Sequence, residues 1–367
     1  PEQSAAIELA KAGGNLKIEA YAGAAKTSTQ KMIAHAMPDR DGVYLAFNSD
    51  IVKEAKGDFP ISVECKTTHS FAMRSQRGFY SNEKMVTNPT SRDVIQVLDI
   101  RRGKSFECGV ELTNYGIANL VKRSLARFCA SARTEISASD VPMEGKFSAQ
   151  AEYRDYRAQV GEFIAPLAQQ FWDRMTDRKS VVPLGFDGYL KTWALGNPQI
   201  DGDYLLLDEA QDTNPVVIDI VAKQKMQVIT VGDRYQQIYE WRGAVNAMTE
   251  IPADNIAYLT TSFRYGQGIA DRAMEVLSLL GAEQKLIGFR TDEKPVGEGS
   301  HCVLARTNGR VIAELLAALE EGQRVFVAEK TVKELKHYVE GAQRLMDGRS
   351  TDFPVDFVGF KNWQEVE

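Results

Sequence analysis

Short apolar runs alternate with amphipathic stretches along much of the chain. Four runs of apolar, β-branched or aromatic residues have the pattern of strands buried on both faces: 16–21, 43–47, 204–207 and 227–231. Apolar residues recur at helical spacing in three other segments: 28–36, 215–222 and 267–280. Strands that alternate with helices favour a parallel sheet. The pattern therefore predicts an α/β fold.

The segment 78–179 has a different pattern. It carries helical spacing at 92–100, 116–132 and 149–175, and no clear buried strand. We expect a helical insertion between two strands of the α/β domain. Its basic residues fit either solvated helix faces or a nucleic-acid surface: Arg101, Arg102, Lys104, Lys122, Arg123, Arg127 and Arg133.

A third region begins near residue 256. Strand-like 303–305 precedes a helical pattern at 310–321, and strand-like 324–328 follows it. This order predicts the opening of a second α/β unit. The expected domains are thus a first unit made of 1–77 and 180–255, the insertion 78–179, and a partial second unit 256–367.

Composition narrows the function classes. No apolar run approaches the ~18–20 residues that cross a bilayer, and the start of the chain has no signal-peptide pattern. The four cysteines form no C-x-x-C pair, which argues against a zinc finger or a disulfide scaffold. A net charge of −6 argues against coating DNA by bulk charge, although a local cationic groove remains open.

A small-residue loop follows the first strand. Ala22 and the candidate nucleotide-binding residues Gly23, Ala24, Ala25, Lys26, Thr27 and Ser28 lead into a helix. Loop amides and a helix N-terminus attract phosphate, Lys26 adds a positive charge, and Thr27 offers a hydroxyl to Mg²⁺. Ala25 stands where such loops usually have glycine, and it costs about 1 kcal/mol if φ must be positive. Small-residue turns of this kind are common, so the loop alone is a weak signal.

Two acids end the third buried strand. Asp208 and Glu209 follow 204–207, at the end of a strand where α/β sheets bind ligands. Asp208 is a candidate Mg²⁺ ligand, and Glu209 a candidate base for the water that attacks the γ-phosphate. An acidic helix N-terminus is the simpler alternative. Together with Lys26 and Thr27, the pair indicates nucleotide hydrolysis with ATP and Mg²⁺.

Two longer motifs resemble a known family. Asp208-Glu209-Ala210-Gln211-Asp212, and the run from Val231 through Gly232-Asp233-Arg234-Tyr235-Gln236-Gln237-Ile238-Tyr239-Glu240-Trp241-Arg242-Gly243 to Ala244, resemble motifs II and III of UvrD/Rep-type superfamily 1 DNA helicases. The chain is most similar to the F-box DNA helicase type, without an F-box segment. The resemblance implies RecA-like P-loop domains, the second incomplete. The family's later motifs find no match before residue 367, so we expect a C-terminal part to be missing. A natural short form is the alternative.

The resemblance also implies residue roles at the nucleotide. Gln3 would read adenine, Gln236 would sense the γ-phosphate, and Arg264 would face that phosphate across the cleft. Arg242 would couple motif III to the nucleotide or DNA, with a structural salt bridge as the alternative. Arg264 alone could equally be a surface ion pair.

Single-stranded DNA is the expected partner, together with duplex junctions. Aromatic rings can stack on bases whatever their sequence, and polar groups can hold phosphates. The candidate DNA-binding residues are Phe47, Asn48, Thr67, His69, Ser70, Tyr239 and Trp241. An aromatic residue is more often part of a core, and Trp241 is the strongest candidate of the three.

The resulting hypothesis is an ATP-dependent helicase or translocase that acts in recombination, repair or replication. The family implies 3′-to-5′ movement. We expect a monomer that does not bind a membrane, with recombination or replication proteins as candidate partners. We expect it in the cytoplasm or, in a eukaryote, in the nucleus. The alternative is an ATP-gated DNA-binding protein with weak hydrolysis, which Ala25 favours. A small-molecule phosphotransferase is disfavoured because it would not need the segment from Gln236 to Trp241.

Overall fold

The computed structural model describes residues 1–46, 48–143, 154–238, 245–291, 302–351, 354, 357 and 360–366. The chain forms two compact units. The first consists of Pro1–Thr90, Ser124–Ile136 and Gln169–Glu293. The second consists of Ser91–Arg123, Ser137–Ala168 and Lys294–Glu367.

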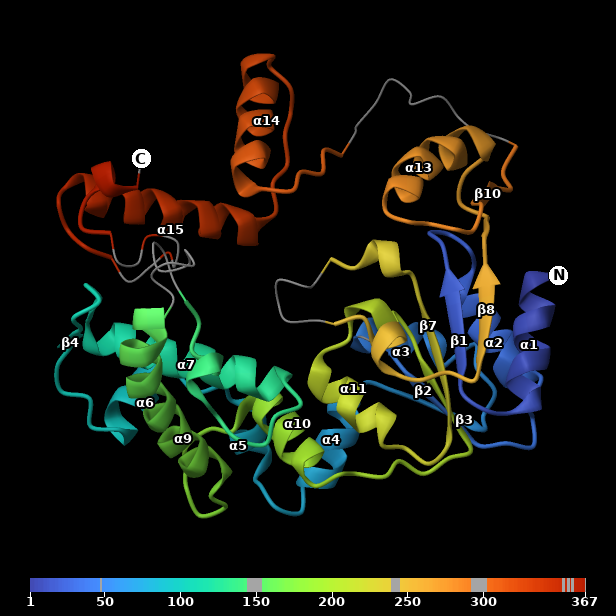
Figure 1. The fold of residues 1–367 in the computed structure, drawn as a ribbon, viewed down its shortest axis with the longest axis horizontal. Helices are drawn as coiled ribbons and strands as arrows, with labels where there is room; N and C mark the ends of the chain where they lie inside the picture. Colours follow the sequence, from blue (N-terminus) through green and yellow to red (C-terminus); the bar gives the residue numbers. More distant parts are fainter. Residues whose placement is uncertain are drawn as a thin grey trace. The chain divides into compact units, whose positions relative to one another are not determined.

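A six-stranded sheet organises the first unit (Figure 1). Its strands, in spatial order, are β3 (Val63–Lys66), β2 (Gly42–Leu45), β6 (Tyr204–Leu207), β7 (Gln227–Gly232), β1 (Leu16–Ala20) and β8 (Asn255–Leu259). Every neighbouring pair is parallel. The predicted α/β fold with a parallel sheet is confirmed, and the four predicted strands are its interior strands.

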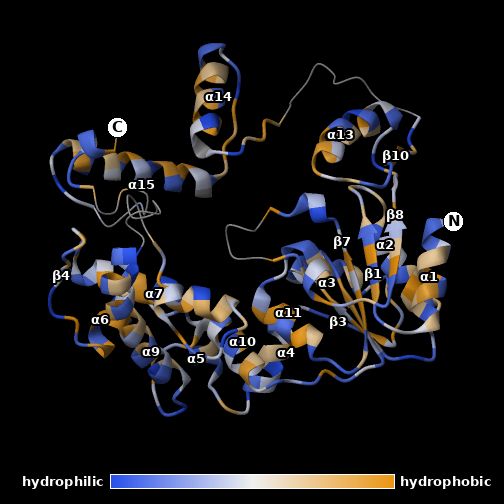
Figure 2. Ribbon diagram, in the orientation of Figure 1, coloured by the Kyte–Doolittle hydropathy of each residue, from blue (hydrophilic) through white to orange (hydrophobic). Residues whose placement is uncertain are grey.

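Helices cover this sheet. The helices of the first unit are α1 (Glu2–Ala12), α2 (Lys26–His35), α3 (Ser49–Ala55), α4 (Thr68–Gln76), α5 (Asn82–Val86), α10 (Gly185–Leu195), α11 (Pro215–Ala222), α12 (Ala247–Glu250) and α13 (Gln267–Leu279). Buried side chains of α1, α2 and α3 form one apolar core with side chains of all six strands. Figure 2 shows hydrophobic positions, in orange, along these strands.

Short elements complete the first unit. They are the 3₁₀ turns η4 (Ala210–Asp212) and η5 (Arg234–Gln236), and the parallel pair β9 (Thr261–Ser262) and β10 (Ile287–Gly288). Strand β8 spans the expected domain boundary at residue 256, yet it pairs with β1 in the first sheet. The division of the chain into RecA-like domains therefore stays a prediction.

The second unit is mostly helical. Its elements are α6 (Ser91–Val97), the antiparallel pair β4 (Lys104–Ser105) and β5 (Glu111–Leu112), η1 (Ala138–Asp140), η3 (Arg157–Gly161), α14 (Asn308–Glu320), α15 (Glu329–Met346) and η8 (Trp363–Glu365). Helices α7 (Asn114–Ala130) and α9 (Glu162–Thr176) have residues in both units. The helices predicted in the insertion are confirmed wherever the structure describes them.

Two predicted strands near the C-terminus are wrong. Segments 303–305 and 324–328 have no regular secondary structure, whereas the helix predicted between them is confirmed as α14. Leu304 is 90% exposed and Phe326 is 93% exposed. Apolar, β-branched composition favours a strand only where a partner strand and a buried face exist, and the described residues supply neither here. Across the described ranges, no helix combines the length and apolarity that crossing a membrane requires.

The central strand generates a stability prediction. Leu206 in β6 is fully buried, so Leu206→Ala should lower the free energy of unfolding of the first unit by about 2–5 kcal/mol. Leu279 on α13 is 88% exposed and serves as the control, because Leu279→Ala should change this free energy by less than about 0.5 kcal/mol. Urea unfolding followed by circular dichroism measures both. Equal losses would contradict the assignment of β6 to the core.

Candidate functional site

The candidate site lies at one edge of the sheet. All six strands are parallel, so their carboxyl ends meet at the same edge, where α/β sheets bind ligands. The small-residue loop follows β1, the two acids follow β6, and the segment of Gln236 follows β7. These strands are neighbours in the order β6-β7-β1. The fold thus brings together three motifs that lie far apart in the sequence.

The loop after β1 contains left-handed backbone at two positions. Gly23 has φ 76°, and Ala25, the N-cap of α2, has φ 57° and ψ 42°. The positive φ that would make alanine costly at position 25 is therefore present. Lys26, Thr27 and Ser28 form the first turn of α2, whose free amides are the ones that bind phosphate in such loops.

Gly23 is required by close packing as well as by its φ. A Cβ at this position would lie 2.5 Å from Ser262 Oγ and 2.7 Å from Arg264 Cβ. The Phe263 amide also donates to the Gly23 carbonyl at 2.9 Å. The chain after β8 therefore lies against the loop, and the exposed Arg264 is brought beside it.

Lys26 and Glu209 form an ion pair across the two motifs. Lys26 Nζ lies 2.7 Å from Glu209 Oε2, with 13% and 36% of the two side chains exposed. Glu209 itself has φ 48°, an uncommon conformation for a residue other than glycine. Strain of this kind persists only where the surroundings impose it, and it clusters at functional sites.

Asp208 is buried beside this pair. It is 6% exposed, and its carboxylate accepts from the Tyr44 hydroxyl at 2.6 Å, from Gln30 Nε2 at 3.1 Å and from the Glu209 amide at 3.0 Å. Burial raises the pKa of Asp208, and the hydrogen bond from Tyr44 acts in the opposite direction. The carboxylate is held in one orientation at the end of β6.

These residues fit Mg²⁺ bound together with a nucleotide. Magnesium sites of that kind use one or two carboxylates and complete their coordination with phosphate oxygens and waters. Asp208 supplies such a carboxylate, and Thr27 supplies a hydroxyl one residue after Lys26. Among the described residues, no group of three or more His, Cys, Asp or Glu side chains could hold a metal alone.

Gln236 lies on η5, directly after β7. Its Nε2 donates to Asp233 Oδ2 at 2.5 Å, and Asp233 Oδ1 accepts from the Tyr235 amide at 3.0 Å. Burial raises the pKa of Asp233, and the hydrogen bond from Gln236 opposes that shift. Gln3 lies on α1, and its Nε2 donates to Thr29 Oγ1 of α2 at 3.1 Å.

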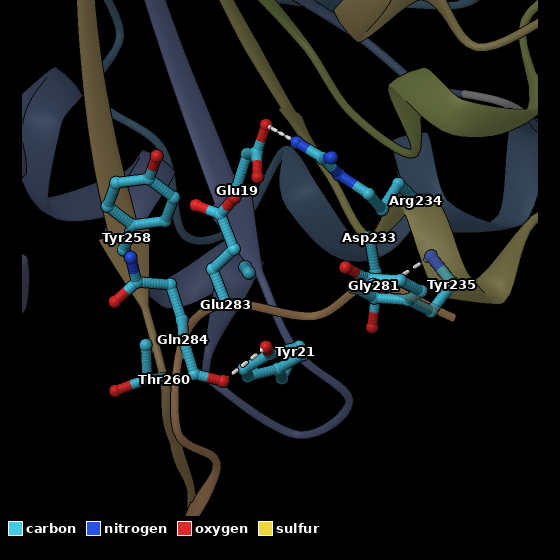
Figure 3. A pocket seen from close by; sticks show the side chains of 11 residues that line it. Glu19, Tyr21, Asp233, Arg234, Tyr235, Tyr258, Thr260, Gly281, Glu283 and Gln284 are labelled. Atoms are coloured by element: carbon cyan, nitrogen blue, oxygen red, sulfur yellow. Dashed lines mark hydrogen bonds and ion pairs between the residues drawn. The ribbon is translucent and has the colours of Figure 1, made fainter. Parts of the chain in front are cut away.

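A pocket lies beside the loop, at the ends of β1 and β7 (Figure 3). The rings of Tyr21 and Tyr235 stack in it with centroids 6.1 Å apart, and Arg234 pairs with Glu19. Burial, aided by neighbouring negative groups, raises the pKa of Tyr21 to about 12. Three carboxylates line the pocket, from Glu19, Asp233 and Glu283. These negative charges would repel a triphosphate. The N-terminus of α2, where Lys26 lies, suits a triphosphate better.

The candidate DNA-binding residues that the structure describes make local contacts. The Asn48 side chain caps α3, and Thr67 Oγ1 caps α4 and lies 2.9 Å from Ser70 Oγ. His69 Nε2 lies 3.6 Å from Asp187 Oδ1. All follow β2 or β3, at the same edge of the sheet as the nucleotide motifs. Their DNA contacts stay predictions, and Phe47, Tyr239, Trp241 and Arg242 lie outside the described residues.

Sequence reasoning missed three residues that hold the acids. Gln30 lies one helical turn after Lys26, a spacing that places both on one face of α2 and could have indicated it. Tyr44 sits in an apolar strand, where a buried hydroxyl needs a partner. Gln211 belongs to motif II, and its Nε2 donates to Glu209 Oε2 at 2.9 Å.

The known proteins to which the chain is similar are DNA helicases. The model of the UvrD/REP helicase N-terminal domain matches residues 61–251. F-box DNA helicase 1 of Gallus gallus is 33% identical over 313 residues, which are 82% of this chain and 30% of that protein. F-box DNA helicase protein 1 of Schizosaccharomyces pombe is 26% identical, covering 97% of this chain and 43% of that protein.

A bacterial relative is more distant. The ATP-dependent DNA helicase PcrA of Staphylococcus aureus is 23% identical over 368 residues, which are 90% of this chain and 45% of that protein. The chain thus spans between 30% and 45% of the length of these three relatives.

The strained alanine generates a prediction with a matched control. Ala25→Gly should raise the free energy of unfolding by about 1 kcal/mol, because glycine adopts positive φ without a steric penalty. Ala24 is buried and has no positive φ, so Ala24→Gly should instead lower this free energy by about 0.5–1 kcal/mol. Urea unfolding of both variants measures the difference. A loss of stability in Ala25→Gly would contradict the strain.

Proposed function

The chain belongs to the UvrD/REP helicase family, and on that premise we propose that the protein is an ATP-driven DNA motor. It binds single-stranded DNA, hydrolyses ATP, moves 3′ to 5′ and unwinds duplex junctions during recombination, repair or replication. The observation that carries the proposal is the ion pair between Lys26 and Glu209 at the N-terminus of α2, with Asp208 beside it. These are the groups that phosphoryl transfer to water requires.

The nucleotide phosphates bind at the N-terminus of α2. The amides of the first turn and Lys26 neutralise their charge, while Gly23 leaves room for a close approach. Thr27 and Asp208 would hold Mg²⁺, which would neutralise charge on the phosphates. Gln3 contacts the adenine, and Arg264 faces the γ-phosphate. Tyr44 and Gln30 keep the Asp208 carboxylate oriented.

Glu209 orients the attacking water and accepts its proton. Without nucleotide, its carboxylate neutralises Lys26. A triphosphate is a stronger partner for that lysine, so binding of ATP exchanges the partner of Lys26 and frees Glu209 for the water. Gln236 reports the γ-phosphate to the DNA-binding segments after β2, β3 and β7.

A second candidate function is ATP-gated DNA binding with weak hydrolysis. One observation favours it: Ala25 occupies a left-handed position where glycine would move more freely. In this case ATP changes DNA affinity without rapid turnover. A small-molecule phosphotransferase would show no response to DNA.

A substitution of Glu209 distinguishes the motor from the ATP-gated DNA-binding protein. In the motor, Glu209→Gln should lower the rate of DNA-stimulated ATP hydrolysis by about 100-fold or more, because an amide cannot accept the proton. Glu8 on α1 has 71% of its side chain exposed, so Glu8→Gln should leave the rate within about twofold of wild type. Phosphate release with and without oligo(dT) measures this rate.

Other outcomes have distinct meanings. ATP-dependent DNA binding without turnover in the wild type would favour the gated binder. ATP turnover that DNA does not change, together with DNA affinity that ATP does not change, would contradict both and favour the phosphotransferase.

A further inference from the structure

Gln211 joins the segment after β6 to the segment after β7. It is 2% exposed, and its Nε2 donates to Glu209 Oε2 at 2.9 Å and more weakly to Asp212 Oδ2 at 3.3 Å. Its Oε1 accepts from the Asp233 amide at 3.1 Å. Asp233 in turn accepts from Gln236. One buried amide thus bridges the candidate base to the residue that holds the candidate γ-phosphate sensor.

The end of β7 is shaped to admit this amide. A Cβ on Gly232 would lie 2.6 Å from Gln211 Oε1 and 2.7 Å from Met248 Sδ. Gly232 has no positive φ, so its backbone conformation does not require glycine. The close approach of Gln211, together with that of Met248, excludes a larger residue.

The residues next to Gln211 also anchor the chain on either side of 239–244. The Ile238 amide donates to Asp212 Oδ1 at 3.1 Å, and the Val245 amide donates to the Thr213 carbonyl at 2.9 Å. Ile238 and Val245 flank this segment, and they hydrogen-bond to Asp212 and Thr213, the two residues after Gln211. A shift of 211–213 would therefore move both Ile238 and Val245.

We propose that Gln211 is a positioning residue that couples Glu209 to the segment after β7. Its amide group fixes one carboxylate oxygen of Glu209, and its amide oxygen fixes the Asp233 backbone. DNA held by the segment after β7 then sets the position of Glu209 and so the rate of hydrolysis. This inference rests on the proposed function, because it assigns the route by which DNA stimulates ATP turnover.

The test compares the ratio of DNA-stimulated to basal ATP turnover in the chain as it stands, with oligo(dT) as the probe. Gln211→Met removes the hydrogen bonds to Glu209, Asp212 and the Asp233 amide at similar side-chain volume. The ratio should fall about tenfold, while KM for ATP stays within about twofold. A merely structural role would lower the active fraction. Both rates would then fall equally and leave the ratio unchanged.

Gly232→Ala provides a second variant that leaves Gln211 in place. Its new Cβ displaces the Gln211 amide oxygen, so the ratio should fall in the same way. The two changes act on one bridge, and the double variant should lose no more than the larger single effect. Gln76→Met is the matched control, because Gln76 is 7% exposed on α4 and outside this network, and its ratio should equal that of wild type.

The outcomes are distinguishable. Stimulation in the wild type that persists undiminished in Gln211→Met or in Gly232→Ala would overturn the coupling role and leave the proposed function intact. A fall of the ratio in Gln76→Met equal to that in Gln211→Met would also overturn it. A wild-type chain without DNA-stimulated turnover would overturn the proposed function and this inference with it.

Discussion

Parallel pairing of β6, β7 and β1 is the constraint from which the candidate site follows. The register aligns Leu207 with Thr230, and Glu19 with Gly232, so the loops that leave the three strands emerge side by side. Strand β6 is buried at every position, so apolar burial holds it in place. The site residues themselves contribute little to this pairing. Lys26 and Glu209 meet because the sheet delivers them to one edge.

Two of the four described non-glycine residues with positive φ lie at the same edge of the sheet. Ala25 and Glu209 both have left-handed backbone, and the ion pair joins Glu209 to Lys26, the residue directly after Ala25. The Thr29 amide donates a hydrogen bond to the Ala25 carbonyl at 2.9 Å, and this bond ties the strained residue into the first turn of α2. Such strained conformations are maintained by the surrounding contacts. A ligand that replaces one of these contacts can therefore release the strain. In the proposed function, ATP takes the place of Glu209 as the partner of Lys26.

The sequence predicts the interior of the sheet better than its edges. The rule applied, apolar runs buried on both faces, finds β1, β2, β6 and β7, which are the four interior strands. It misses β3 and β8, which are edge strands with partly exposed positions, such as Tyr258 at 38% exposure. The same rule fails at 303–305 and 324–328, where apolar residues have no partner strand among the described residues. Pairing is a tertiary property that local composition does not contain.

The acids and the loop could be found from their sequence patterns, but the contacts that hold the acids could not. Gln30 and Tyr44 reach Asp208 from other elements, far away in the sequence. Gln211 lies only two residues after Glu209, but spacing alone does not show that its amide group bonds to the Glu209 carboxylate. A crystal structure of the chain with Mg²⁺ and a non-hydrolysable ATP analogue tests the central claim most directly. The account predicts phosphate oxygens within hydrogen-bond distance of Lys26 Nζ, Asp208 at the metal, and Glu209 released from Lys26. A nucleotide bound away from the N-terminus of α2, with the pair between Lys26 and Glu209 intact, would contradict it.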